Sequence, residues 1–184
     1  MPQLPPYRLI RSRRKTISIQ LTPDNQVVVR CPYGLPIAQI EAILAEKAAW
    51  LEKHRNRLAA IPKEPPFSQA ELQQMAQRTE ALLKERLPLW AATLGVTYCR
   101  VTVRCQHTRW GSCSSRGNLN FNCLLALVPE EVLDYVVVHE LCHRKQTNHA
   151  PAFWAEVGAA LPNYPQCKAW LKENEQRLLA RIPG

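Results

Sequence analysis

The sequence contains no C-x-x-C pair, and its 7 cysteines are an odd number. A disulfide framework uses an even, patterned set, so we expect reduced thiols and a cytoplasmic protein. The first residues, Met-Pro-Gln-Leu-Pro-Pro, lack the apolar stretch of a secretory signal peptide. No apolar run approaches the length of a membrane span either, so we expect no membrane contact.

Acidic residues are scarce, with 15 Asp and Glu against 24 Lys and Arg, which gives a formal net charge of +9. This excess favours phosphates or nucleic acid as partners, but a basic protein that is merely soluble fits equally well. Aromatic residues make up only 7% of the chain, without the interleaved platforms typical of single-strand binders. With 184 residues, 46% of them apolar, we expect one domain, or one domain plus an arm.

The N-terminal third predicts a β-rich arm followed by a long helix. Alternating residues favour strands at 7–10, 16–21 and 27–31, the last two joined by a turn at Pro23–Asn25. Apolar residues at helical spacing predict one helix from Pro36 to about Ala60. The basic run Arg11–Lys15 is either a solvated turn or an anion-binding edge. The proline-rich stretch Ile61–Phe67 is the clearest linker, so we expect an arm at 1–66 and the main domain at 67–184.

The remaining sequence mixes helices with short strands, which predicts an α+β fold. Ser68 and Glu71 form a capping-box signal for a helix that runs to about Leu94, with Gly95 as its stop. Strands are expected at 96–105 and 118–123, separated by a turn-rich segment at 109–117. Two further helices are expected at 151–160 and 166–181.

One stretch, His139–His149, concentrates the residues that carry chemistry. His139 and His143 flank Glu140 in an H-E-x-x-H motif, and His149 follows after five intervening residues. The preceding Pro129–Val138 begins with proline and acids, which is typical of a helix N-terminus. On a helix, the two histidines lie one turn apart on the same face. The alternative is a helix whose histidines are satisfied without a metal, but a shuffled chain would contain this motif on the order of once in a hundred tries.

The motif predicts a catalytic zinc site. Catalytic zinc takes three protein ligands and keeps one position for water, and His139, His143 and His149 supply three neutral ligands. Glu140 is the expected general base for the zinc-bound water. Cys142 is either a fourth ligand, which would make the site structural, or a packing residue. Asp134 and Glu156 are candidates for the acids that orient the histidines.

Substrate contacts are expected from the strand just before the metal helix. In Asn118–Cys123 amides alternate with apolar side chains, which indicates a half-exposed strand. If its edge is free, an extended peptide can pair with it, and we expect Asn120, Asn122 and Trp110 to contact substrate. An internal strand without a free edge is the alternative.

The sequence resembles the YgjP-like metallopeptidase family, which is related to the SprT and WLM zinc peptidases. The resemblance rests on blocks in a fixed order: Tyr7–Thr16, Pro32–Gly34, Lys47–Trp50, Arg109–Ser114, Tyr135–His143, Asn148–His149 and Phe153–Trp154. It implies a small zincin-like α+β domain with an N-terminal β-rich arm. It also implies zinc on the three histidines with Glu140 as general base.

Three functions follow as hypotheses. The first is a zinc-dependent metallopeptidase that acts on extended or unfolded peptide segments. The second comes from the resemblance, because nucleotide pyrophosphohydrolysis with uridine triphosphate (UTP) as substrate is assigned to a relative. The third is a basic nucleic-acid-binding module with a structural metal, which predicts steep salt dependence of binding.

Overall fold

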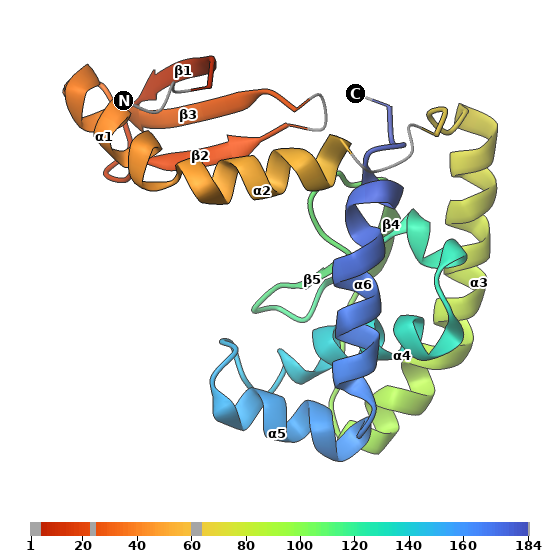
Figure 1. The fold of residues 1–184 in the computed structure, drawn as a ribbon. Helices are drawn as coiled ribbons and strands as arrows, with labels where there is room; N and C mark the ends of the chain where they lie inside the picture. Colours follow the sequence, from red (N-terminus) through yellow and green to blue (C-terminus); the bar gives the residue numbers. More distant parts are fainter. Residues whose placement is uncertain (1–4, 23–24, 60–63, 184) are drawn as a thin grey trace. The chain divides into compact units, whose positions relative to one another are not determined.

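The computed structural model describes residues 5–22, 25–59 and 64–183, and its mixture of helices and two small sheets confirms the predicted α+β class (Figure 1). The chain divides into two compact units, Met1–Lys63 and Glu64–Gly184, each with its own hydrophobic core. Most of the net charge belongs to the first unit, which has 11 Lys and Arg against 4 Asp and Glu. The division into an arm at 1–66 and a catalytic domain at 67–184 stays a prediction.

The first unit contains a three-stranded sheet of order β1-β3-β2. Its strands are β1 (Tyr7–Ser12), β2 (Ser18–Leu21) and β3 (Val27–Pro32), so all three predicted strands form. β3 is the central strand, parallel to β1 and antiparallel to β2. Of the predicted turn, residues 23 and 24 lie outside the described part. Asn25 adopts a φ of 61°, a left-handed conformation that asparagine tolerates.

The predicted single helix from Pro36 to about Ala60 is wrong, because the chain forms α1 (Ile37–Glu46) and α2 (Ala48–Ala59). Lys47 separates them with φ −93° and ψ 5°, outside the helical region, although neither glycine nor proline marks the break. Both helices bury apolar side chains against β3, so burial rather than helix propensity determines their boundaries.

One residue of the basic run Arg11–Lys15, at the end of β1, has a structural role. The Arg11 guanidinium donates to the carbonyl oxygens of Tyr33 (2.6 Å) and Leu35 (2.8 Å), and so anchors the segment that leads into α1. This contact favours the interpretation of the run as part of a turn.

Four helices of the second unit follow their sequence signals closely. They are α3 (Gln69–Leu94), α4 (Glu130–Cys142), α5 (Pro151–Ala160) and α6 (Tyr164–Leu179). The Ser68 and Glu71 capping box is present, and Gly95 ends α3 at a φ of 64°. Of the linker predicted before α3, residues 61–63 lie outside the described part. Within that part, no helix combines the length and apolar character that crossing a bilayer requires.

A second three-stranded sheet has the order β4-β6-β5. Its strands are β4 (Val101–Arg104), β5 (Gly111–Cys113) and β6 (Leu119–Asn122); β6 is parallel to β4 and antiparallel to β5. The segment 109–117, expected to be turn-rich, also contains β5. Of the two alternatives left open for the strand at 118–123, the internal strand is the correct one, because β6 is central in the sheet. After β6 the chain enters a short 3₁₀ helix, η1 (Cys123–Leu127).

Helix α4 lies at the centre of the second unit. It contacts α3, α5, α6 and β5, and most of its residues are buried. Three consecutive valines, Val136–Val138, are weak helix formers, but packing on all sides of a buried helix overrides that preference. The last turn of α4 and its C-cap residue His143 carry the H-E-x-x-H motif.

Candidate metal centre

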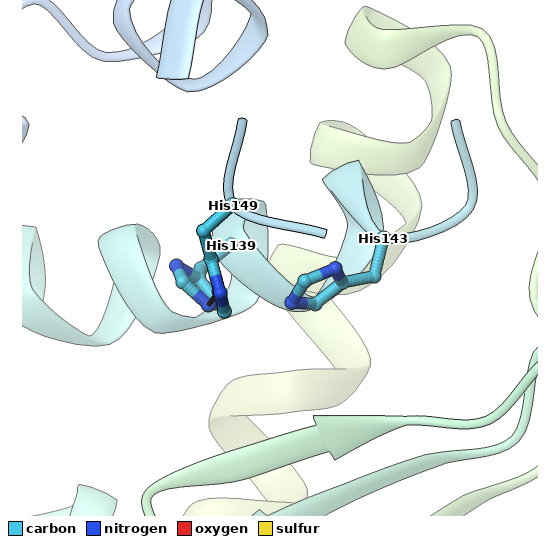
Figure 2. Close-up of side chains that lie close together, drawn as sticks. All are labelled: His139, His143 and His149. Carbon is cyan, nitrogen blue, oxygen red and sulfur yellow. Dashed lines mark hydrogen bonds between the residues drawn. The ribbon is translucent and has the colours of Figure 1, made fainter. Parts of the chain in front are cut away.

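Three histidines converge at the C-terminal end of α4. His139 and His143 lie on the same face of the last turns, and the chain then reverses through a short loop that returns His149 to them before α5 begins (Figure 2). Asn148 stabilises this return, because its side-chain oxygen accepts from the backbone N–H of Ala150 at 3.1 Å. The structure therefore brings the three predicted metal ligands together.

The spacing of the imidazoles suits a single small cation. One ring nitrogen from each histidine lies within 4.8 Å of the others, and Nε2 of His139 and Nε2 of His149 are 3.0 Å apart. Two nitrogens that each bind zinc at ~2.0–2.1 Å with tetrahedral geometry are about 3.3 Å apart. The donor set thus fits a tetrahedral metal with only small side-chain shifts. The role of the three residues as ligands stays a prediction.

Phe153, on α5, forms the floor of this cluster. It is fully buried, and its ring centroid lies 4.6 to 4.9 Å from the centroids of all three imidazoles. The neighbouring Trp154 stacks on His149 with ring centroids 5.7 Å apart. This apolar wall restricts the rotamers of the histidines and keeps water away from one side of the cluster.

Two of the imidazoles, those of His139 and His149, are held in the neutral form that a metal requires. Burial, with smaller contributions from His143 and His149, lowers the pKa of His139 to about 3. Burial also lowers the pKa of His149, with a smaller contribution from His143. Neutral imidazoles keep their nitrogen lone pairs available to a cation at neutral pH.

Glu140 lies next to strand β5. Its side chain is only 6% exposed, and a Cβ added to Gly111 would lie 2.7 Å from Cγ and Oε1 of Glu140. Burial raises the pKa of Glu140 and the nearby charge of Arg109 opposes this in part, so that the pKa is about 8. A carboxyl group with a pKa near neutrality is suited to exchange protons during a reaction.

An open cleft of about 470 Å³ connects these groups. Its walls are residues 111–115 on one side and the three histidines, Glu140 and Thr147 on the other. The cleft is therefore bounded by the end of α4, the loop that carries His149 and the strand β5. The contribution of β5 was missed by sequence reasoning; the available signal was Gly111, which leaves room for Glu140.

The residues predicted to contact substrate do not form a substrate surface. Asn122 is fully buried and donates to the carbonyl oxygens of Gln106 (2.7 Å) and Arg109 (2.9 Å), so this prediction is wrong. Trp110 is only 8% exposed and belongs to the hydrophobic core, so it is not part of a substrate-binding surface either. Asn120 is half-buried and donates to Ser112 Oγ at 3.2 Å. Because β6 is central, its backbone cannot pair with a peptide.

The acids expected behind the histidines have other partners. Asp134 accepts hydrogen bonds from Arg86 and from Trp90 Nε1, and so joins α3 to α4. Glu156 forms an ion pair with Lys145 at 2.8 Å.

Among the described residues, the second ring nitrogens of His139 and His143 have different surroundings. His143 Nδ1 lies 3.0 Å from the carbonyl oxygen of Gln146, whereas His139 Nδ1 is buried without a hydrogen-bond partner. Cys142 is fully buried and lies outside the cluster of candidate ligands, as expected for a packing residue.

The model of the YgjP-like family, described as a metallopeptidase domain, matches residues 15–76 and 63–174. The chain belongs to the YgjP-like family. This confirms the resemblance, and it makes the YgjP-like protein a metal-dependent hydrolase of the metallopeptidase class, with a peptide or protein as substrate. No curated protein matches the chain.

Two solved structures are similar to parts of the YgjP-like protein. The metallopeptidase zymogen of Pyrococcus abyssi abylysin is 24% identical in sequence, with a TM-score of 0.47. The matched region covers 54% of this chain and 96% of the abylysin chain. The metallopeptidase zymogen of Methanocaldococcus jannaschii jannalysin is 19% identical in sequence, with a TM-score of 0.45. The matched region covers 50% of this chain and 95% of the jannalysin chain.

Proposed function

We propose that this protein is a zinc peptidase that cleaves extended segments of peptides or unfolded proteins. His139, His143 and His149 are the proposed zinc ligands, and Glu140 is the proposed general base. One observation carries the proposal: three imidazole nitrogens lie within 4.8 Å of one another beside a buried carboxyl group, and all four side chains line one open cleft.

Zinc is the metal that this donor set favours. Three imidazoles without a carboxylate or thiolate match zinc sites that keep a position for water, whereas calcium and magnesium require oxygen ligands. When bound, zinc would polarise the scissile carbonyl group and lower the pKa of the attacking water. The three neutral histidines would leave the full charge of the cation available for this purpose.

Glu140 has the position and the proton affinity for acid–base catalysis. Its carboxyl group lies between the ends of α4 and β5, next to the cleft. In the proposed reaction it takes a proton from the attacking water and delivers it to the amine that leaves. Burial favours the protonated form and a nearby cation favours the carboxylate, so the two influences bring the pKa of Glu140 into a range where both transfers are feasible.

The free edge of β5 supports an extended peptide as the substrate. Within the described residues, β5 pairs only with β6, so its other edge has unpaired backbone groups along the cleft. An extended chain that adds to this edge would place a peptide bond beside Glu140 and the histidines. Recognition through backbone hydrogen bonds gives little sequence preference and excludes helical or tightly folded substrates.

The proposal is tested with zinc-loaded protein and its Glu140→Gln variant. Both are offered a reduced, alkylated protein, the same protein in its native fold, and UTP. We expect cleavage of the unfolded protein only, and a loss of roughly 10²–10⁴-fold in the variant at unchanged zinc content. Turnover of UTP alone, abolished in the variant, would replace the peptidase proposal with nucleotide hydrolysis.

A further inference from the structure

Two cysteines outside the metal cleft lie in direct contact. Sγ of Cys105 and Sγ of Cys123 are 2.8 Å apart. Cys105 directly follows β4, and Cys123 directly follows β6. The parallel pairing of β4 and β6 ends with Arg104 opposite Asn122, one residue before each cysteine. The paired strand ends therefore bring the two cysteines close together.

This arrangement meets the requirements of a disulfide without backbone movement. Neighbouring strands are ~4.7–4.9 Å apart, inside the range of ~4.4–6.8 Å that the Cα atoms of a disulfide span. The separation of the sulfur atoms is below the ~3.5–4.0 Å of an ordinary contact between carbon atoms. A side-chain shift of less than about 1 Å brings the two sulfur atoms to the bonded distance of ~2.05 Å.

The two thiols differ in their access to solvent. Cys105 is exposed, whereas Cys123 is fully buried. Burial, together with the contact with Cys105, raises the pKa of Cys123 to about 12. An oxidant in solution therefore reaches Cys105 first, and Cys123 is available only to a partner that already lies beside it.

We propose that Cys105 and Cys123 form a reversible disulfide that holds the wall of the cleft. A hydroperoxide is the oxidant: the Cys105 sulfur attacks it, the O–O bond breaks, and Cys105 becomes a sulfenic acid as water or an alcohol leaves. The Cys123 sulfur then attacks the Cys105 sulfur, the S–O bond breaks, and the hydroxyl group leaves as water with the Cys123 proton. In total, two thiols lose two electrons and two protons to one peroxide, and a small dithiol reverses the reaction by exchange.

The disulfide would close a loop that contains β5, which forms one wall of the cleft. Residues 106–122 lie between the two cysteines, and they include β5 and the buried Asn122, which fixes Gln106 and Arg109. A cross-link at the base of this loop restricts the unfolded chain and holds β5 against β6. The oxidised form therefore keeps the cleft assembled at temperatures at which the reduced form loses it.

The test uses the full, reduced chain and its Cys105→Ser and Cys99→Ser variants. Both substituted positions are exposed, so both variants are expected to fold, and Cys99→Ser is the matched control. After brief hydrogen peroxide treatment, free thiols are titrated and tryptic peptides are analysed by mass spectrometry. Cleavage after Arg104 and Arg109 isolates Cys105 on a five-residue peptide, and fragmentation locates its partner.

We expect wild type and Cys99→Ser to lose two thiols each and to give the Cys105–Cys123 cross-link, which dithiothreitol reverses. The melting temperature should rise by roughly 5–10 °C on oxidation in both, and not in Cys105→Ser. A cross-link of Cys105 to any other cysteine, over-oxidation of Cys105 without a cross-link, or seven unreacted thiols would overturn the proposal. The readouts do not depend on hydrolysis, so they are independent of the proposed peptidase activity.

Discussion

At the residue scale, the H-E-x-x-H motif and His149 could be located from the sequence because their spacing is a local property of one helix and one short loop. Asn122 and Trp110 could not be placed in this way. Alternation shows that Asn122 shares a face with Asn120, but it does not show that the loop before β5 folds over Asn122 and takes both of its amide protons. Burial of a polar side chain depends on such distant partners.

The raised pKa of Glu140 predicts a pH dependence of stability in the metal-stripped protein. The folded-state pKa is about 8, above the ordinary glutamate value of 4.5, so between these values the folded chain binds up to one more proton than the unfolded chain. The stabilisation is complete below about pH 4.5 and is lost as the pH rises through 8, at up to ~1.4 kcal/mol per pH unit.

Urea unfolding at pH 5, 6.5 and 8 measures this effect. Relative to Glu140→Gln, which cannot ionise, metal-stripped wild type should become steadily less stable across the series. Parallel stability curves for the two proteins would contradict the assignment of a buried, protonated Glu140.

Gly111 is predicted to set the position of Glu140. A methyl group at this position would come within 2.7 Å of the Glu140 side chain and displace it. Gly111→Ala should therefore reduce peptide hydrolysis by ~10–100-fold, because misplacing a catalytic group by about 1 Å is enough for such a loss, while zinc content stays unchanged. Gly34→Ala is the control, since nothing lies within 4 Å of its added Cβ. Equal activity of the two variants would show that Gly111 does not position Glu140.

At the element scale, the helices of the second unit follow from caps and periodicity, whereas the order of its strands does not. Ser68, Gly95 and Pro151 mark helix ends through local hydrogen bonding and backbone preference, so they are readable from sequence. β5 has only three residues and lies in a segment rich in Ser and Gly, where no alternation can develop. The central place of β6 depends on β4 and β5 pairing with it from both sides, which is tertiary information.

Asn122 is predicted to hold the second sheet to the loop before β5. Asn122→Ala removes two hydrogen bonds to buried or half-buried carbonyl groups and one from Leu124 N–H, at an expected cost of about 2–4 kcal/mol in the free energy of unfolding. Asn120→Ala, on the same face, removes one bond to Ser112 and should cost no more than about 1 kcal/mol. Urea unfolding compares the two variants; a larger loss for Asn120→Ala would contradict the assigned roles.

At the scale of the whole molecule, the two units have different compositions. Lys and Arg outnumber Asp and Glu by 11 to 4 in the first unit but only by 13 to 11 in the second, which contains the cleft. The excess positive charge that suggested phosphate or nucleic-acid partners is therefore not a property of the unit that carries the histidines. Composition averaged over the chain concealed this difference.

The second unit is predicted to fold without the first. Residues 64–184 contain their own core, the second sheet and all four proposed catalytic side chains, and about 120 residues are enough for an independent domain. The isolated segment should unfold cooperatively and bind zinc as the full chain does, as followed by circular dichroism and metal analysis. A segment that stays unfolded with zinc present would show that the first unit is required for folding.

The central claim is that His139, His143 and His149 together hold one zinc ion, and the zinc content of purified variants tests it most directly. Wild type should bind about one equivalent after dialysis, as should His107→Ala, whose exposed histidine lies outside the cluster. Alanine at any one of the three positions should reduce zinc to a small fraction of that value while the circular dichroism spectrum is preserved. Full zinc content in a variant that lacks all three histidines would contradict the account.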